Sequence, residues 1–206
     1  MKVWLLLAVA VPLLAGDPRL FYSKTFPGSM PPYVQITLEK TGEIEYRDAP
    51  DDDNPLKYKL TETEVAEVFG LADKLDHFKT PVESGLKVAF MGKKVFRYES
   101  GAEKHEVEFN YSEDPSAKAM WEWFERMAES AMHRIDLDRS AKYDKLGVFK
   151  ALALLGGALE RKRLVGLDQY LPTLDRIIKN ESYMHAARAR ASEIAEAIRS
   201  GAPPAQ

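Results

Sequence analysis

The stretch DPSAKAMWEWFERMAESAMHRI, residues 114–135, decides the fold. Asp114 and Pro115 are residue types favoured at the N-cap and the first position of a helix, so a helix is predicted to begin here. Its apolar residues occupy roughly half the circumference, more than the ~100° stripe of an ordinary surface helix. They are Ala117, Met120, Trp121, Trp123, Phe124, Met127, Ala128 and Ile135. A helix that is apolar this far round has two neighbours, so we expect it to bridge a sheet before it and helices after it.

The residues before this helix alternate between apolar and polar, which predicts strands. Val34, Ile36 and Leu38 alternate with polar residues, and a Thr-Gly turn follows, so 33–47 is predicted to form a hairpin. Further strands are expected at 56–60, 86–91, 94–100 and 106–111, with turns at Gly92 and Gly101.

One helix is expected within this first half. Thr61 and Glu64 have the spacing of a capping box, which satisfies backbone donors at a helix start. The helix that they open carries its apolar residues on one face, namely Val65, Val68, Phe69, Ala72, Leu75 and Phe78.

Helices are expected at 146–163, 168–179 and 182–199. In the first of these, Phe149 and Leu154 lie off the main apolar stripe, which is typical of a central buried helix or of one that meets another chain. The expected fold class is therefore α+β, with an N-terminal antiparallel sheet and one helix (17–115) packed on a C-terminal helical bundle (116–200). Residues 201–206 are expected to form a disordered tail.

Composition excludes several classes of protein. The 206 residues include 29 Lys and Arg, 32 Asp and Glu, and no Cys. A nucleic-acid-binding protein would normally show a basic excess. Without cysteine there is no disulfide, zinc-thiolate site, iron–sulfur cluster or thiol nucleophile. No cofactor is expected.

The N-terminus has the layout of a secretory signal peptide. A short positive start, Met1-Lys2, precedes the twelve-residue apolar run 3–14 and the small residues Ala15-Gly16. This run is shorter than the roughly 20 residues of a membrane span. We expect residues 1–16 to be a signal peptide, the mature chain to carry no transmembrane span, and the protein to be extracytoplasmic, periplasmic or secreted. An uncleaved N-terminal anchor is the alternative.

Six short strings are spread along the chain: YSKTFPGS (22–29), PYV (32–34), KVAFMGKK (87–94), FNYSEDP (109–115), DKLGV (144–148) and LPTLDRI (171–177). Together they resemble a family of uncharacterised secreted bacterial proteins. The N-terminal half is also similar to a small bacterial α+β domain of unknown function. No activity, cofactor or catalytic residue comes with this resemblance.

Three groups of residues suggest chemistry, and each has a simpler explanation. Asp51, Asp52 and Asp53 gather oxygen ligands of the kind that calcium prefers, but they lack EF-hand spacing and also suit a solvated loop.

His133 and Asp136 would share a helix face, with Asp138 close by. A His–carboxylate pair can act as an acid and base near neutral pH, whereas the simpler interpretation is a surface ion pair.

Lys87, Lys93, Lys94 and Arg97 concentrate positive charge on one predicted strand pair. They could bind an anionic ligand, or they could protect a sheet edge from pairing with other chains.

The common catalytic motifs, such as G-x-S-x-G, H-E-x-x-H and the phosphate loop, do not occur in the sequence. The sequence therefore favours an exported, non-catalytic binding or scaffolding protein with a protein or cell-envelope partner, self-associating through Phe149 and its neighbours. The alternatives are a hydrolase-type enzyme with a dispersed site around His133, Asp136 and Asp138, and an anion- or polysaccharide-binding protein.

Overall fold

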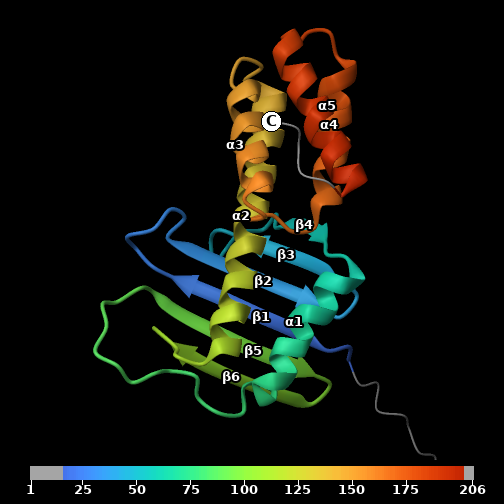
Figure 1. Cartoon of the computed structure of the whole chain (residues 1–206). Coiled ribbons are helices and arrows are strands. Elements are labelled where there is room, and N and C mark those ends of the chain that lie inside the picture. The colour runs from blue at the N-terminus through green and yellow to red at the C-terminus, as the bar shows by residue number, and fades with distance from the viewer. Residues whose placement is uncertain (1–15, 202–206) are drawn as a thin grey trace, which may run out of the picture.

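The computed structural model describes residues 16–201, which form a six-stranded sheet and a set of helices (Figure 1). The strands are β1 (Arg19–Thr25), β2 (Tyr33–Glu39), β3 (Glu43–Arg47), β4 (Leu56–Lys59), β5 (Lys93–Ser100) and β6 (Glu103–Phe109). The helices are α1 (Glu62–Lys74), α2 (Pro115–Tyr143), α3 (Val148–Glu160), α4 (Leu171–Lys179) and α5 (His185–Ser200), with short 3-10 helices η1 (Asp76–Phe78) and η2 (Leu167–Tyr170). The expected α+β class is confirmed. The predicted signal peptide, except Gly16, and the predicted tail, except Gly201, lie outside the described residues.

The sheet is antiparallel, with the strand order β4-β3-β2-β1-β5-β6. The predicted β2–β3 hairpin is confirmed. Its turn needs a glycine, because Gly42 has a φ of +90° and a Cβ there would lie 2.9 Å from the carbonyl oxygen of Leu60. The chain then passes through α1 and a long loop before β5 returns beside β1, which places β1 in the interior of the sheet.

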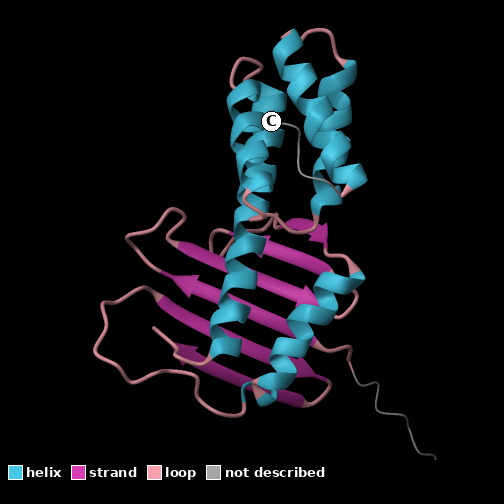
Figure 2. Ribbon diagram, in the orientation of Figure 1, coloured by secondary structure: helices cyan, strands magenta, loops and turns pink. Residues whose placement is uncertain are grey.

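One face of the sheet is buried and the other is open to solvent. Alternate residues turn to the buried face, as in Tyr22 of β1, which is paired in register with Ile36 of β2 and Phe96 of β5. Helices α1 and α2 lie across this face (Figure 2). The intervening residues on the opposite face are half-buried or exposed.

The two helix starts that were predicted from cap residues are confirmed. Thr61 and Glu64 form the capping box of α1, and Asp114 accepts hydrogen bonds from the backbone N–H groups of Ser116 and Ala117 at 2.7 and 3.0 Å. The six expected apolar residues of the first helix and η1 are all buried against the sheet.

Helix α2 joins two hydrophobic cores along its length. Its first half, as far as Ala131, packs over the sheet, and its second half contributes Leu137 and Ala141 to a core with α3, α4 and α5. The helix bridges the sheet and the bundle, as expected, but it does so end to end rather than through two opposite faces. On the half that covers the sheet, Lys118 and Glu122 are exposed.

Several predicted boundaries differ from the structure. Residues 86–91 are not a strand: they pair with no strand of the sheet, and the side chains of 86–90 are exposed. The segment 168–179 divides into η2 and α4, where Pro172 opens the second helix. Strand β1 was not among the expected strands.

Candidate functional site

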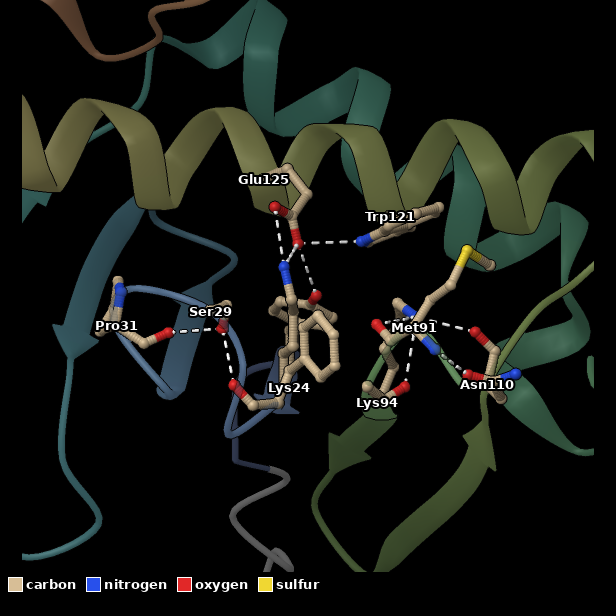
Figure 3. A network of polar contacts seen from close by, with 11 residues as sticks. Lys24, Ser29, Pro31, Met91, Lys94, Asn110, Trp121 and Glu125 are labelled. Carbon is tan, nitrogen blue, oxygen red and sulfur yellow. Dashed lines mark hydrogen bonds and ion pairs between the residues drawn. The ribbon is translucent and has the colours of Figure 1, made fainter. Parts of the chain in front are cut away.

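Glu125 lies at the centre of a polar network between the sheet and α2 (Figure 3). Its carboxylate accepts hydrogen bonds from Lys24 Nζ at 2.9 and 3.2 Å, from the Tyr22 hydroxyl at 3.0 Å and from Trp121 Nε1 at 2.9 Å. Burial raises the pKa of Glu125, but the hydrogen bonds and the positive charge of Lys24 outweigh it, so that the pKa lies below its usual value of 4.5. The carboxylate is therefore held as an anion.

The period of each element places its own two residues on one face. Trp121 and Glu125 are four residues apart and share one face of α2. Tyr22 and Lys24 are two residues apart on β1 and turn to the same side of the sheet. Burial and the negative charge of Glu125 raise the pKa of the Tyr22 hydroxyl well above its usual value, so it stays protonated.

Lys94 is fully buried beside this network, with 0% of its surface exposed. Its Nζ donates to the backbone carbonyls of Asn110, Met91 and Gly92 at 2.7, 3.2 and 3.3 Å. The same ammonium lies 4.7 Å from the centre of the Trp121 ring, a cation–π contact. Burial lowers the pKa of Lys94, and the nearby Lys24 lowers it further. Three carbonyls use all three donors of the ammonium.

Residues 79–92, here called the long loop, are fixed to the end of β6. The side chain of Asn110 accepts a hydrogen bond from the N–H of Met91 at 2.7 Å and donates to the carbonyl of Ala89 at 3.1 Å. Glu83 accepts from the N–H groups of Asn110 and Tyr111 at 2.6 and 3.4 Å, and these bonds hold its pKa below the usual value. Side chains thus replace the ladder that a strand would have formed.

Residues 26–32, the short loop between β1 and β2, lie at the same end of the sheet as the long loop (Figure 1). The Ser29 hydroxyl is 2.8 and 2.7 Å from the carbonyl oxygens of Phe26 and Pro31. The rings of Phe26 and Phe90 meet edge to face with centroids 5.9 Å apart, so the two loops touch. We call these two loops together the loop end.

Two hollows flank Glu125 on the surface. One, of about 320 Å³, lies between the short loop and α2, and the other, of about 410 Å³, lies along α2 beside Tyr111. Arg163 lines both, and its guanidinium pairs with Glu129 at 2.9 Å and with Glu122 at 3.4 Å. The charges that line the hollows are therefore largely paired with one another.

The network offers little for catalysis. A general base needs a free lone pair and a nucleophile needs access to substrate. Glu125 already accepts four hydrogen bonds, Tyr22 is held protonated, and Lys94 has no exposed surface. These groups instead hold the sheet, α2 and the long loop in one arrangement.

Exposed apolar side chains mark a different kind of site. Nine large apolar residues are exposed among residues 16–201, and they fall into two groups. One group is at the loop end, with Met30, Leu86, Val88 and Phe90, and the other is on the helical end of the molecule, with Tyr143, Leu146, Phe149, Leu154 and Met184. The two ends lie far apart in the fold (Figure 1).

The two aspartates that were predicted to accompany His133 form their ion pairs with arginines, although the charge of Asp136 still acts on His133. Asp136 pairs with Arg139, while Asp138 pairs with Arg134 at 2.6 Å and also accepts a hydrogen bond from Thr173 of α4. Within the described part of the chain, no hydrogen bond joins His133 to either aspartate. Burial lowers the pKa of His133. Asp138 links α2 to α4.

The four basic residues do not form one cluster. Lys87 lies in the long loop, and Lys94 turns to the buried face of β5 while Lys93 and Arg97 turn to the open face. Arg97 pairs with Glu99 at 3.0 Å and Glu106 at 3.2 Å. The idea that these residues protect a sheet edge is wrong, because β5 lies between β1 and β6.

Asp51, Asp52 and Asp53 lie in the loop between β3 and β4. Asp52 accepts a hydrogen bond from the N–H of Asn54 at 2.9 Å, which stabilises the turn. Between residues 16 and 201, no three His, Asp or Glu side chains are grouped so that they could hold a metal ion. In the same range, no helix combines the length and the apolar character needed to cross a membrane.

Sequence reasoning did not select Glu125, Lys24 or Asn110. One signal was available: Glu125 lies within the apolar stripe of α2, one turn after Trp121, where a carboxylate needs a partner. Nothing local indicates that the partner is Lys24, because the two residues are 101 positions apart.

Comparison of the chain with protein-family models found no match, and comparison with curated proteins found none either.

Proposed function

We propose that this chain is an exported, non-catalytic scaffolding protein that pairs with a second copy of itself through α3. The observation that carries the proposal is the row Phe149, Ala153, Leu154 and Gly157, which stays exposed or half-buried after α3 has packed against α2 and α5. Large exposed apolar side chains on a helix face are typical of an interaction surface.

Gly157 supports this proposal because glycine inside a helix costs roughly 0.5–1 kcal/mol relative to alanine. The neighbouring Gly156 is buried and faces the guanidinium of Arg190, whose Nη2 would lie 2.5 Å from a Cβ at this position and would have to move. At Gly157 a Cβ would meet the side chain of Arg161 alone, at 3.3 Å. A second helix that approaches closely at this position would explain the missing side chain.

The spacing of the row suits a two-fold pair. Phe149, Ala153 and Gly157 follow one another at intervals of four residues, and so they share a face of α3. In an antiparallel pair centred on Ala153, the Phe149 ring of each copy would lie over Gly157 of the other. A large residue then meets a small one twice, as a self-complementary interface requires.

Export is supported by the N-terminal leader, residues 1–16, and the absence of cysteine from the sequence is compatible with an oxidising compartment. Besides a second copy of itself, the exported chain would bind a protein or another component of the cell envelope. The non-catalytic character is supported by the hydrogen bonds that occupy Glu125 and Tyr22 and by the full burial of Lys94.

Light scattering on the chain beginning at Asp17, which contains every described helix and strand, tests the proposal. We expect dimers at high protein concentration, and monomers for Phe149→Glu at the same concentration. Phe90→Glu is the matched control, because it alters an exposed phenylalanine at the other end and should leave the dimer intact. A strict monomer at every concentration, or a dimer that Phe149→Glu does not weaken, would overturn the proposal.

A further inference from the structure

The loop end exposes apolar side chains that the fold does not use. Met30 is 92% exposed, and Leu86, Val88 and Phe90 are 50%, 41% and 59% exposed. They belong to the two loops that lie together at one end of the strands, whereas α3 presents a helix face (Figure 1). Apart from the contact of Phe90 with Phe26, no aromatic contact ties these four side chains to the rest of the described chain.

The loop end carries an exposed, unpaired cation between its apolar side chains. Residues 18–38 and 84–98 contain no Asp or Glu, but most of their basic side chains form ion pairs with glutamates of other segments, namely Arg19, Lys24, Lys93 and Arg97. Lys87, which stands between Leu86 and Val88, is exposed and has no ion-pair partner within residues 16–201. Glu83 and Glu108, which come from the same end of the sheet, are occupied by backbone N–H groups and by Lys93 respectively.

The loops are held in place even though their tips are exposed. Lys94 and Asn110 each bond to the backbone at the end of the long loop, and Ser29 closes the short loop. These bonds hold the backbone of both loops, so the loops lose less conformational entropy when their apolar side chains bind a partner.

From this combination we infer that the loop end binds the surface of an anionic lipid bilayer. Leu86, Val88, Phe90 and Met30 enter the boundary between headgroups and acyl chains, and Lys87 meets lipid phosphates. Apolar insertion together with basic residues is the chemistry of peripheral membrane binding. The long stem of Lys87 lets its ammonium stay at headgroup depth while its neighbours go deeper.

A bilayer fits these observations better than a protein partner does. Protein interfaces combine an apolar centre with a polar rim that makes directional hydrogen bonds. Here the apolar residues lie on two protruding loops, and Lys87, which stands between two of them, has no ion-pair partner within residues 16–201. The inference does not depend on the self-pairing of α3, which concerns the opposite end of the molecule.

Vesicle sedimentation of the chain beginning at Asp17 tests the inference. The probes are vesicles of equal parts phosphatidylglycerol and phosphatidylcholine, and vesicles of phosphatidylcholine alone. We expect the chain to bind the anionic vesicles more tightly, and added salt to weaken that binding. The double substitution Leu86→Ser and Phe90→Ser should weaken binding by a factor of about ten or more. Lys87→Glu should weaken binding to the anionic vesicles by a similar factor of about ten.

Matched controls come from the helical end. Leu146→Ser and Lys150→Glu change the same residue types at exposed positions of the helical end and should leave vesicle binding unchanged. Failure of the chain to bind anionic vesicles, equal binding to both kinds of vesicle, or full binding by the loop variants would each overturn the inference. A chain that binds no vesicles but still forms the α3 dimer would overturn this inference alone.

A second measurement is independent of how the serine variants fold. The chain has no cysteine, so Leu86→Cys can be labelled uniquely with an environment-sensitive dye. We expect the emission to shift to the blue when anionic vesicles are added, because the dye enters an apolar region. The same dye on Met184→Cys, at the helical end, should not respond. An unchanged emission from the dye at position 86 would contradict insertion.

Discussion

The ammonium of Lys24 on β1 lies 2.9 Å from Oε1 of Glu125 on α2, and this ion pair joins the interior of the sheet to the helix that covers it. Tyr22 and Trp121 donate to the same carboxylate, one from each element. The pair therefore sets how α2 sits on the sheet, and with it the position of the two loops beside it.

Replacement of Glu125 by Gln should destabilise the fold. The change leaves Lys24 half-buried without a counter-charge, and we expect the free energy of unfolding to fall by about 1–3 kcal/mol. Urea unfolding measures this loss. Glu122→Gln is the control, because Glu122 lies one turn away on α2 but is 66% exposed and pairs with Arg163 at 3.4 Å. The control should cost less than about 0.5 kcal/mol, and equal losses for the two variants would count against the network.

Acid should weaken the fold through the same carboxylate. The folded-state pKa of Glu125 lies below its usual value of 4.5. Protons then bind more readily to the unfolded chain. The contribution of Glu125 is complete at neutral pH and is lost as the pH falls from about 4.5 through the lower folded-state pKa.

Unfolding free energies measured between neutral pH and pH 3 test this expectation, with pH as the only variable. Glu125→Gln should show a smaller loss of stability across the acidic range than the natural chain does, because Gln does not titrate. Parallel curves for the two proteins would show that another group dominates.

Replacement of Lys94 by Met should loosen the long loop. Met fills much of the same volume but leaves the carbonyls of Asn110, Met91 and Gly92 without their charged donor. We expect trypsin to cut after Lys87 about ten-fold faster than in the natural chain, because the cost of local opening falls. Lys93→Met, which changes the exposed neighbour, should leave this rate nearly unchanged. A resistant Lys94→Met variant would mean that the ammonium does not hold the loop.

Replacement of Gly157 by Ala should have opposite effects on the folded chain and on its pairing. Alanine favours the helix, and we expect the monomer to gain about 0.5–1 kcal/mol in unfolding free energy. The added methyl group would occupy the space proposed for Phe149 of a second copy, so dimerisation should weaken. Thermal unfolding at low concentration and light scattering at high concentration separate the two effects. A variant that is more stable and also dimerises more strongly would contradict the role proposed for Gly157.

Local sequence patterns predicted those features that depend only on contacts between residues a few positions apart. Thr61 and Glu64 predicted the start of α1, and Asp114 with Pro115 predicted the start of α2, because a cap is satisfied within one turn. The sequence also places Phe149 and Leu154 off the main apolar stripe of α3, and both are exposed in the structure.

The same reasoning failed at residues 86–91. The alternation of apolar residues there is typical of a strand, but a strand also needs a neighbouring strand to pair with. Residues 86–91 pair with no strand of the sheet; the side chain of Asn110 binds the backbone of Ala89 and Met91 instead, and Leu86 and Phe90 are exposed.

By itself, the sequence determined the α+β class, the cap residues, the helical second half and the two faces of most strands, because these depend on contacts within a few residues or on the period of burial. Only the tertiary structure decided that Lys94 is buried beneath three carbonyls, that Glu125 meets Lys24, and that two loops bring Met30 and Phe90 to one end. Those outcomes depend on which strands become neighbours and on where α2 crosses them. Pairing over 101 residues, as between Lys24 and Glu125, leaves no periodic trace in the chain.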